Sequence, residues 1–360
     1  MKYLIVSDTH FGISSFNKKR FEYMIAYFEN EVFPFILENK IKHVIHLGDL
    51  VDKRNVIDFY IDNGVKNRFI DWFEQNKVHL YLIVGNHDMY YKNERSINYC
   101  SINFKGRFKY VHVIDEIMKK KIGKLNFLFV PWIVNEIELE MIKDSDADIC
   151  CGHFEISGVK IGEKVYLTQG LNQSVFKNFK LTLSGHIHTI QKLGKNILYV
   201  GTPYQLMWAD YNQEKGVWLL KDDLSIELIE NKISPKFVKI FCYENYFEIE
   251  NERFERIDEI KEVIENNFFK FIILEKRKDL DEIYEFLSEN AQFKYEIITE
   301  SEVKAYQILN GEIDVKVKSI NEIIEESLEA MQIESDRKEF IVREFNEIIT
   351  NVEKGSMNEV

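Results

Sequence analysis

The 360-residue sequence has little cysteine and little proline, four residues of each, and its apolar runs are no longer than a strand. The absence of about 20 consecutive apolar residues excludes a transmembrane helix, so no membrane partner is expected. The N-terminus lacks a basic region followed by a long apolar run, and a secretory leader is therefore not expected either. The reducing cytoplasm is the favoured compartment.

The four cysteines form no CxxC pair and no spacing that is typical of a disulfide framework. Cys150 and Cys151 directly precede Gly152-His153, so a thiolate metal ligand is one interpretation. The favoured interpretation is that both thiols are small, buried residues at the end of a strand.

The composition is acidic, with a formal net charge of −13, a charged fraction of 30% and a hydrophobic fraction of 45%. This balance is typical of a soluble protein with a sizeable core, and the length indicates one large domain with smaller appendages. Taken alone, the negative charge argues against nucleic acid as a partner. Metal ions in a cleft, or a second subunit, could nevertheless supply the positive field that a phosphate backbone requires.

Strand and helix patterns alternate along the first part of the chain. Apolar runs predict strands over 2–7, 43–47 and 78–84, and helix-spaced apolar residues predict helices over 17–38 and 56–76. Such alternation indicates parallel pairing in an α/β fold. Later strands are predicted over 108–114, 125–130, 147–152, 180–184, 196–200, 215–220 and 224–229. Residues 1–232 are therefore predicted to form a two-sheet β-sandwich flanked by helices.

A polar stretch that ends at Pro235 precedes a second module. Residues 235–300 are predicted to form a small α/β cap domain, with strands over 236–242, 269–274 and 293–299 and helices over 254–266 and 278–289. Residues 301–318 read as a linker. A capping box at Ser319 and helix-spaced apolar residues predict a helical hairpin over 319–352. The pattern leaves open whether this hairpin packs on its own chain or docks on a partner.

Five motifs occur where an apolar strand is predicted to end: Asp8-Thr9-His10, Gly48-Asp49, Gly85-Asn86-His87-Asp88, Gly152-His153 and Gly185-His186-Ile187-His188. Ligands of open α/β sheets bind at the carboxyl ends of strands, so these segments should converge on one edge. A lone histidine is more often structural than a ligand. The histidines inside strands are interpreted as structural, namely His43, His46, His79 and His112. The other five share one positional pattern, which indicates a functional site.

The residue types in these motifs suit metal ions. Two carboxylates, four imidazoles and one amide form a donor set without thiolate, which favours Mn²⁺, Fe²⁺ or Zn²⁺ over Ca²⁺ or Cu⁺. The seven candidate ligands are Asp8, His10, Asp49, Asn86, His153, His186 and His188. Seven ligands exceed what one ion takes from a protein while leaving room for substrate. They predict two ions, about 3.5–4 Å apart, with a shared carboxylate.

The order of these motifs resembles that of the calcineurin-like metallophosphoesterases, and within them the SbcD-type nuclease subunits of recombination complexes, including their phage members. Asp88 stands where protein phosphatases typically have Glu, and Asp52 is followed by Lys53-Arg54 rather than Arg-Gly. Gly201-Thr202-Pro203-Tyr204 follows the last motif, as it does in that branch. The motif resemblance covers residues 1–210, and beyond residue 235 it rests on layout.

The resemblance implies a two-metal DNA nuclease, both exonuclease and single-strand endonuclease, that processes DNA ends in recombination and repair. Mn²⁺ is the first candidate for both ions, with Mg²⁺, Fe²⁺ and Zn²⁺ as alternatives. By resemblance, Asp49 bridges two ions, one held by Asp8, His10 and His188 and the other by Asn86, His153 and His186. His87 would protonate the leaving 3′ oxygen, and Asp88 would orient His87. Cellular archaeal and eukaryotic relatives often carry a second histidine at the position of Asp52, whose role is left open.

The resemblance also implies partners: single- and double-stranded DNA ends, an SbcC-type coiled-coil ATPase, and a second copy of the chain, which together would give a heterotetramer. The hairpin at 319–352 is the predicted ATPase dock. The helix at 56–76 is the predicted dimer face, with ordinary core packing as the alternative. Basic residues near the motifs are candidate DNA contacts, with solvated charge as the alternative: Lys18, Lys19, Arg20, Lys53, Arg54, Lys92 and Arg95.

Two rival functions stay open at this level. A phosphodiesterase for small substrates would keep the metals, although it would need neither the cap at 235–300 nor the hairpin. A non-catalytic assembly scaffold would be expected to lose ligands, whereas Asp8, Asp49 and His87 are all present.

Overall fold

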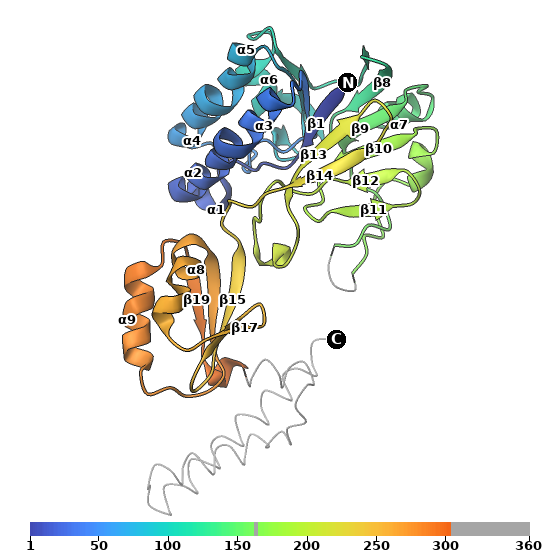
Figure 1. Cartoon of the computed structure of the whole chain (residues 1–360). Coiled ribbons are helices and arrows are strands. Elements are labelled where there is room, and N and C mark those ends of the chain that lie inside the picture. The colour runs from blue at the N-terminus through green and yellow to red at the C-terminus, as the bar shows by residue number, and fades with distance from the viewer. Residues whose placement is uncertain (162–164, 304–360) are drawn as a thin grey trace, which may run out of the picture. The chain divides into compact units, whose positions relative to one another are not determined.

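The computed structural model describes residues 1–161 and 165–303 (Figure 1). The hairpin predicted over 319–352, and the linker after residue 303, lie outside the described residues. Within the described ranges, no helix is both long and apolar enough to cross a membrane.

The first sheet has six strands in the order β14-β13-β1-β2-β3-β6. Four of them are parallel, namely β1 (Lys2–Val6), β2 (His43–His46), β3 (His79–Ile83) and β6 (Val111–Ile114). The antiparallel strands β13 (Gly216–Lys221) and β14 (Ile226–Glu230) extend the sheet beyond β1. The alternating strand and helix pattern therefore predicts this half of the fold correctly.

The second sheet has the order β11-β12-β10-β9-β8-β7. Its parallel centre consists of β8 (Leu125–Val130), β9 (Ile149–His153), β10 (Leu181–Gly185) and β12 (Ile197–Tyr199). The edges are β7 (Met118–Ile122) and β11 (Gln191–Leu193), both antiparallel to their neighbours. Sequence patterns missed both edge strands, because β7 reads Met-Lys-Lys-Lys-Ile and β11 has only three residues.

The two sheets pack face to face around one apolar layer. Ile5 and Ile45 from the first sheet share this layer with Phe127, Ile149 and Leu183 from the second. The predicted two-sheet sandwich is confirmed.

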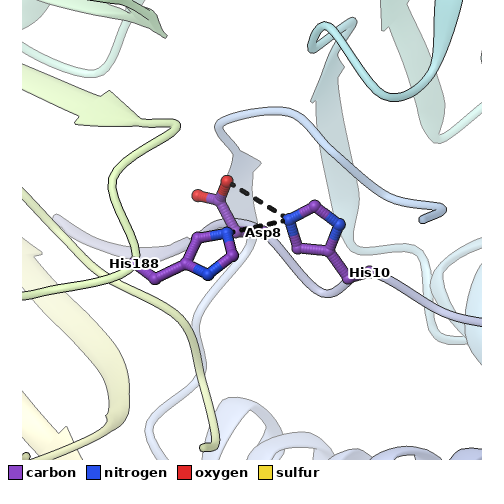
Figure 2. A group of neighbouring side chains, drawn as sticks. All are labelled: Asp8, His10 and His188. Carbon is purple, nitrogen blue, oxygen red and sulfur yellow. Dashed lines mark hydrogen bonds and ion pairs between the residues drawn. The ribbon is translucent and has the colours of Figure 1, made fainter. Parts of the chain in front are cut away.

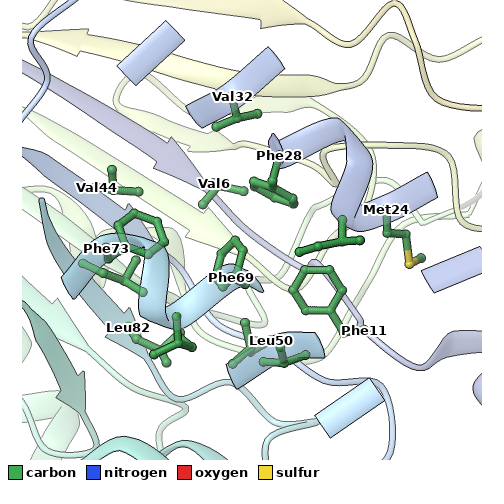
Figure 3. Packing of buried hydrophobic residues seen from close by; sticks show 14 of the residues in the cluster. Val6, Phe11, Met24, Phe28, Val32, Val44, Leu50, Phe69, Phe73 and Leu82 are labelled. Atoms are coloured by element: carbon green, nitrogen blue, oxygen red, sulfur yellow. The ribbon is translucent and has the colours of Figure 1, made fainter. Parts of the chain in front are cut away.

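Helices cover the outer face of the first sheet (Figures 1 and 3). After the short α1 (Ile13–Phe16), one continuous helical stretch comprises α2 (Lys18–Tyr27), a π-helical segment (Phe28–Val32) and α3 (Phe33–Glu38). A second comprises α4 (Phe59–Gly64), a π-helical segment (Val65–Ile70) and α5 (Asp71–Asn76). Asn17 caps the first stretch by accepting a hydrogen bond from one backbone N–H of the first turn, and Asp58 caps the second by accepting from two. Both predicted helices are thus confirmed.

Shorter elements complete this part of the chain. The hairpin β4 (Met89–Tyr91) and β5 (Glu94–Asn98) leads into α6 (Tyr99–Phe104). Helix α7 (Glu136–Lys143) and two 3-10 turns, Gln173–Phe176 and Trp208–Asp210, lie in the second half. Ile142 of α7 and Phe176 join the apolar cluster on the outer face of the second sheet, so the sandwich is covered on both sides.

The segment after Pro235 has its own five-stranded sheet, in the order β17-β16-β15-β18-β19, and its own apolar cluster. Its elements are β15 (Phe237–Cys242), β16 (Phe247–Ile249), β17 (Glu252–Phe254), a 3-10 turn (Ile257–Ile260), α8 (Lys261–Asn266), β18 (Phe268–Ile273), α9 (Leu280–Asn290) and β19 (Tyr295–Ile298). Residues 1–297 nevertheless form one compact unit.

The helix predicted over 254–266 is wrong in its first half. Glu250 and Asn251 both have positive φ, 50° and 71°, which forms a tight turn between β16 and β17. The chain therefore stays extended to Phe254, and the α-helix begins only at Lys261.

Gly64 of α4 allows an unusually close helix contact, which can be tested by substitution. A Cβ at this position would lie 2.4 Å from Cε1 of the buried Phe21 ring. At a helix position with free space around it, replacement of Gly by Ala stabilises the folded protein by up to about 1 kcal/mol. Here we expect Gly64→Ala to lower the free energy of unfolding by about 1–3 kcal/mol, because the ring cannot move without repacking. Denaturant unfolding measures this; the exposed Asn63→Ala is the control, and a stabilised Gly64→Ala would contradict the packing.

Candidate metal centre

The side chains of the five motifs lie at the carboxyl ends of parallel strands, three in the first sheet and two in the second. Figure 2 shows Asp8, His10 and His188 pointing toward one another, the first two from the segment after β1 and the third from the segment after β10. The sandwich thereby brings residues 178 positions apart into contact.

Asp8, His10 and His188 form the first group of potential ligands. Nε2 of His10 lies 3.1 Å from Nε2 of His188 and 3.8 Å from Oδ1 of Asp8. Asp8 and His10 are almost fully buried, and His188 is half-buried. The second ring nitrogen of His10 faces Oδ1 of Asp52 at 3.5 Å, an arrangement that commonly orients metal-binding histidines. The geometry therefore gives Asp52 a position behind His10.

Asn86, His153 and His186 form the second group, together with Asp49. Oδ1 of Asn86 lies 2.9 Å from Nε2 of His153 and 3.0 Å from Nδ1 of His186. Nδ1 of His153 lies 2.9 Å from the carbonyl oxygen of Leu47, which leaves Nε2 directed at the group.

The carboxylate of Asp49 lies between the two groups. Its Oδ2 is 3.7 Å from Nε2 of His10 in the first group and 3.2 Å from Nε2 of His153 in the second. Its Oδ1 accepts a hydrogen bond of 2.8 Å from the backbone N–H of His87. This is the position that a carboxylate shared between two ions requires.

The loops that carry the ligands have a strained backbone. Asp8, His10, Asp49 and His186 have positive φ values of 51°, 45°, 55° and 80°. Such conformations cost about 1–3 kcal/mol for a residue with a side chain and persist only where the surroundings enforce them. Their concentration at one edge of the sandwich is typical of a functional site.

Two glycines let the backbone approach the carboxylates closely. A Cβ at Gly85 would lie 2.2 Å from Oδ1 of Asp49. At Gly185 it would lie 2.1 Å from Oγ of Ser7 and 2.8 Å from Oδ2 of Asp8. Any side chain at either position would displace a potential ligand.

Contacts outside the ligand groups tie these loops together. The Tyr204 hydroxyl donates to the carbonyl of Thr9 at 2.7 Å, and the N–H of Thr202 donates to the carbonyl of His188 at 3.2 Å. The buried Lys215 also donates to the carbonyl of His188, at 2.6 Å, and pairs with Asp210 at 2.7 Å. This ion pair is not predictable from the sequence, because neither residue belongs to a motif.

His87 and Asp88 have separate roles. Nδ1 of His87 lies 2.5 Å from the carbonyl oxygen of Asp52, so this nitrogen carries a proton and Nε2 is left available. The prediction that Asp88 orients His87 is wrong. The buried Asp88 carboxylate instead accepts hydrogen bonds of 2.9–3.2 Å from three backbone N–H groups, those of Gly85, Asp49 and Val51. The Asp88 carboxylate therefore orders the loops that carry Asp49 and His87, and the backbone carbonyl of Asp52 holds the His87 ring.

The buried carboxylates and imidazoles perturb one another. Burial and the neighbouring Asp49 raise the pKa of Asp8. Burial alone would also raise the pKa of Asp49, but His153 and His10 hold it well below its usual range. Burial would lower the pKa of His153, yet Asp49 and Asp8 raise it to about 9. In the ion-free protein a protonated His153 therefore supplies the positive charge that these carboxylates need.

The donor set fits divalent cations. Asp8 and Asp49 are 0% and 1% exposed, and buried carboxylates are unfavourable without a nearby positive charge. The surrounding donors are imidazole nitrogens and an amide oxygen. Cys151 packs between the sheets and Cys150 on the outer face of the second sheet, so the interpretation of both thiols as small buried residues is confirmed.

Arg20 and Arg95, two of the predicted DNA contacts, are engaged within the protein. Arg20 is 8% exposed, donates to Ser14 Oγ at 2.6 Å and to the carbonyl of Leu206, and lies over the ring of Phe268. The Arg95 side chain is 10% exposed and pairs with Glu138. Their prediction as DNA contacts is therefore corrected: both side chains brace the fold.

The other basic candidates differ in availability. Lys18, Lys53 and Lys92 are exposed, and Arg54 is half-buried. Lys19 is exposed as well but donates to the carbonyl of Gln292 at 2.6 Å. Lys53 and Arg54 directly follow Asp52, whose side chain faces His10.

Comparisons with known proteins agree with this geometry. The family model described as calcineurin-like phosphoesterase matches residues 1–189. Exonuclease subunit 1 of Enterobacteria phage T4 is 29% identical over 222 residues, which are 61% of this chain and 64% of that protein. Protein 078R of Invertebrate iridescent virus 3 and protein 244L of Invertebrate iridescent virus 6 are both provisionally named phosphoesterases. They are 26% and 30% identical, over 56% and 39% of this chain and 57% and 50% of their own lengths. The chain thus covers less than two thirds of each relative.

The raised pKa of His153 predicts that metal binding releases protons. A histidine must be neutral to bind an ion, whereas His153 is protonated below its pKa of about 9 in the ion-free protein. Its protonation stabilises the ion-free fold fully below pH about 6.5, and this contribution is lost as the pH rises through about 9. Apparent Mn²⁺ affinity should therefore rise with pH up to about 9. Calorimetric titration in two buffers of different ionisation enthalpy measures the release, and a pH-independent affinity without proton release would contradict the charge arrangement.

Proposed function

The chain belongs to the calcineurin-like phosphoesterase family, and on this premise we propose that it is a two-metal DNA nuclease that hydrolyses phosphodiesters at DNA ends. The observation that carries the proposal is the position of Asp49 between two ligand groups, with the backbone of His87 bound to the same carboxylate. The similarity to a protein named as an exonuclease subunit favours DNA over a small phosphodiester.

In the proposed reaction, the residues of this chain would have three different roles. Asp8, His10 and His188 would hold one ion and Asn86, His153 and His186 the other, with Asp49 shared. Bound ions would supply Lewis acidity that activates water and neutralises charge on the phosphate. The carbonyl of Asp52 accepts from Nδ1 of His87. When the ring carries a second proton, on Nε2, that nitrogen can donate it to the leaving oxygen and return the ring to its neutral form. Asp88 keeps the loops of Asp49 and His87 in register.

The proposed assembly includes a second copy of the chain. The apolar stripe of the helix at 56–76 cannot form the dimer face, because Ile61, Val65 and Phe69 are fully buried in the core. Exposed apolar side chains do lie at the start of that helix, on the β4–β5 hairpin and on α6, among them Val56, Phe59, Tyr90, Ile97 and Ile102. Four of these five, all but Phe59, line one pocket. We therefore assign the dimer face to this patch.

An SbcC-type ATPase is the further proposed partner, in line with a relative named as a subunit. Its dock is proposed at 319–352, outside the described residues. Recombination and repair of DNA ends would be the process that such a complex serves.

Substitution of Asp49 and of His87 separates metal binding from acid catalysis. We expect His87→Ala to retain Mn²⁺ binding and to lose about 10²–10⁴-fold in hydrolysis of linear DNA, because its proton donor is gone. Asp49→Ala should lose both binding and hydrolysis. Calorimetry and release of labelled nucleotides measure the two properties, with His112→Gln as a histidine control outside the centre. Full DNA hydrolysis by both variants would refute the mechanism, and activity on bis-p-nitrophenyl phosphate without activity on DNA would refute the substrate.

Introduction of a negative charge into the exposed apolar patch tests the proposed dimer face. Phe59 is 90% exposed, so Phe59→Asp should not unfold the monomer. In a dimer, its carboxylate would be buried against an apolar partner, and association should weaken by tenfold or more. Sedimentation measures the mass, with Ile137→Asp on α7, 73% exposed, as the matched control. An unchanged dimer, or a wild-type monomer, would count against the assignment.

A further inference from the structure

Trp132 lies directly beside the candidate metal centre, although no sequence motif includes it. Its ring centroid is 5.0 Å from that of His186 and 5.9 Å from that of His153, two members of the second ligand group. The side chain is half-buried, so part of the indole stays accessible. Any substrate bound at this group would lie within reach of the ring.

A pocket of about 220 Å³ opens at this point. Its walls include Trp132, Ile133, Phe154, Glu155, Gln169 and Leu171, and it also reaches His153 of the second group. The volume lies below the roughly 300 Å³ at which pockets for drug-sized ligands begin, so it suits one ring system rather than a whole nucleotide.

The chemistry of the walls selects an uncharged flat ring. Trp132, Ile133 and Leu171 offer an aromatic face and aliphatic surface, and the described lining residues include neither lysine nor arginine. Apart from His153, which belongs to the metal centre, the walls would therefore offer a phosphate group no positive charge. Glu155, which is partly exposed, and the exposed Gln169 supply hydrogen-bonding groups at the rim. An aromatic face with polar groups at its edge is the pattern that binds a nucleobase.

We propose that this pocket holds the nucleobase next to the scissile phosphate, stacked on Trp132, while the metal centre holds the phosphate. The inference rests on the proposed DNA nuclease function and deepens it. Base stacking does not depend on sequence, because every base has an aromatic face. The pocket would thus align any terminal nucleotide for hydrolysis and would leave a residue without a base poorly positioned.

The backbone that carries Trp132 is held rigidly from both sides. The backbone N–H of Trp132 donates to the carbonyl of Val84 at 2.9 Å, and the backbone carbonyl of Trp132 accepts from the Arg95 side chain. Arg95 pairs with Glu138, which in turn accepts from the N–H of Val134 at 3.0 Å. Arg95 is therefore a positioning residue for Trp132. Because the backbone is fixed in this way, only the side-chain torsions of Trp132 have to be ordered when a base stacks on it.

Abasic substrates test the proposal. The full-length Mn²⁺-loaded chain is given a single-stranded oligonucleotide, and a matched one with tetrahydrofuran abasic residues at the two terminal positions of each end. Terminal release is followed over a range of concentrations. We expect KM to be about 5- to 150-fold higher for the abasic substrate, the range that stacking on one aromatic ring accounts for. In Trp132→Ala this difference should vanish through a higher KM for the normal substrate, and Trp132→Phe should restore much of it.

Trp208→Ala is the matched control, because it removes an indole that is half-buried and lies tilted against the ring of Phe237 in the cap. This variant should keep the wild-type ratio between the substrates. Thermal melting and Mn²⁺ binding confirm that each variant is folded. An equal loss on both substrates in Trp132→Ala, or no discrimination by the wild type, would overturn the base pocket and leave the nuclease function standing. Hydrolysis of neither substrate by the wild type would refute the nuclease function, and this inference with it.

Discussion

The mutual repulsion of two buried carboxylates, Asp8 and Asp49, is the constraint on which the rest of this structure depends. Both are almost completely shielded from water, and burial of unpaired negative charge is strongly unfavourable. A neighbouring imidazole reduces this repulsion. Against the effect of burial, the two carboxylates raise the pKa of His153 to about 9, so its ring takes a proton when no ion is present. Without bound ions, this arrangement of buried charges contributes little to the stability of the fold. Divalent ions in the same place would remove the repulsion and make use of the strained loops.

The two-sheet sandwich is what makes this arrangement possible. The first sheet contributes the loops of Asp8, Asp49 and Asn86, and the second contributes His153 and His186. Each ligand group therefore combines residues from both sheets. Hydrogen bonds from Tyr204 to the carbonyl of Thr9 and from Lys215 to the carbonyl of His188 then anchor the two loops that carry the first ligand group. Packing between the two sheets thereby fixes the positions of the potential metal ligands.

Much of this was predictable from the sequence, because buried strands and strand-end motifs leave direct signals. The apolar runs predict β1, β2, β3, β8, β9 and β10, and the motifs that follow five of them predict which residues meet. What the sequence could not show depends on three-dimensional partners. Arg20 and Arg95 look like surface cations until their buried partners are known, and Asp88 looks like a partner of His87 until three backbone N–H groups are found around it. Trp132 carries no local signal, since only the fold places it beside His186.

The central claim is that two ions share Asp49, and the protein's own ligand geometry gives this claim a sharp test. A crystal structure with Mn²⁺ at neutral pH, with anomalous scattering recorded near the manganese edge, locates the ions independently of any activity. The account predicts two anomalous peaks per chain, one among Asp8, His10 and His188 and one among Asn86, His153 and His186, with Asp49 contacting both. A single peak, or two peaks of which Asp49 contacts only one, would contradict it.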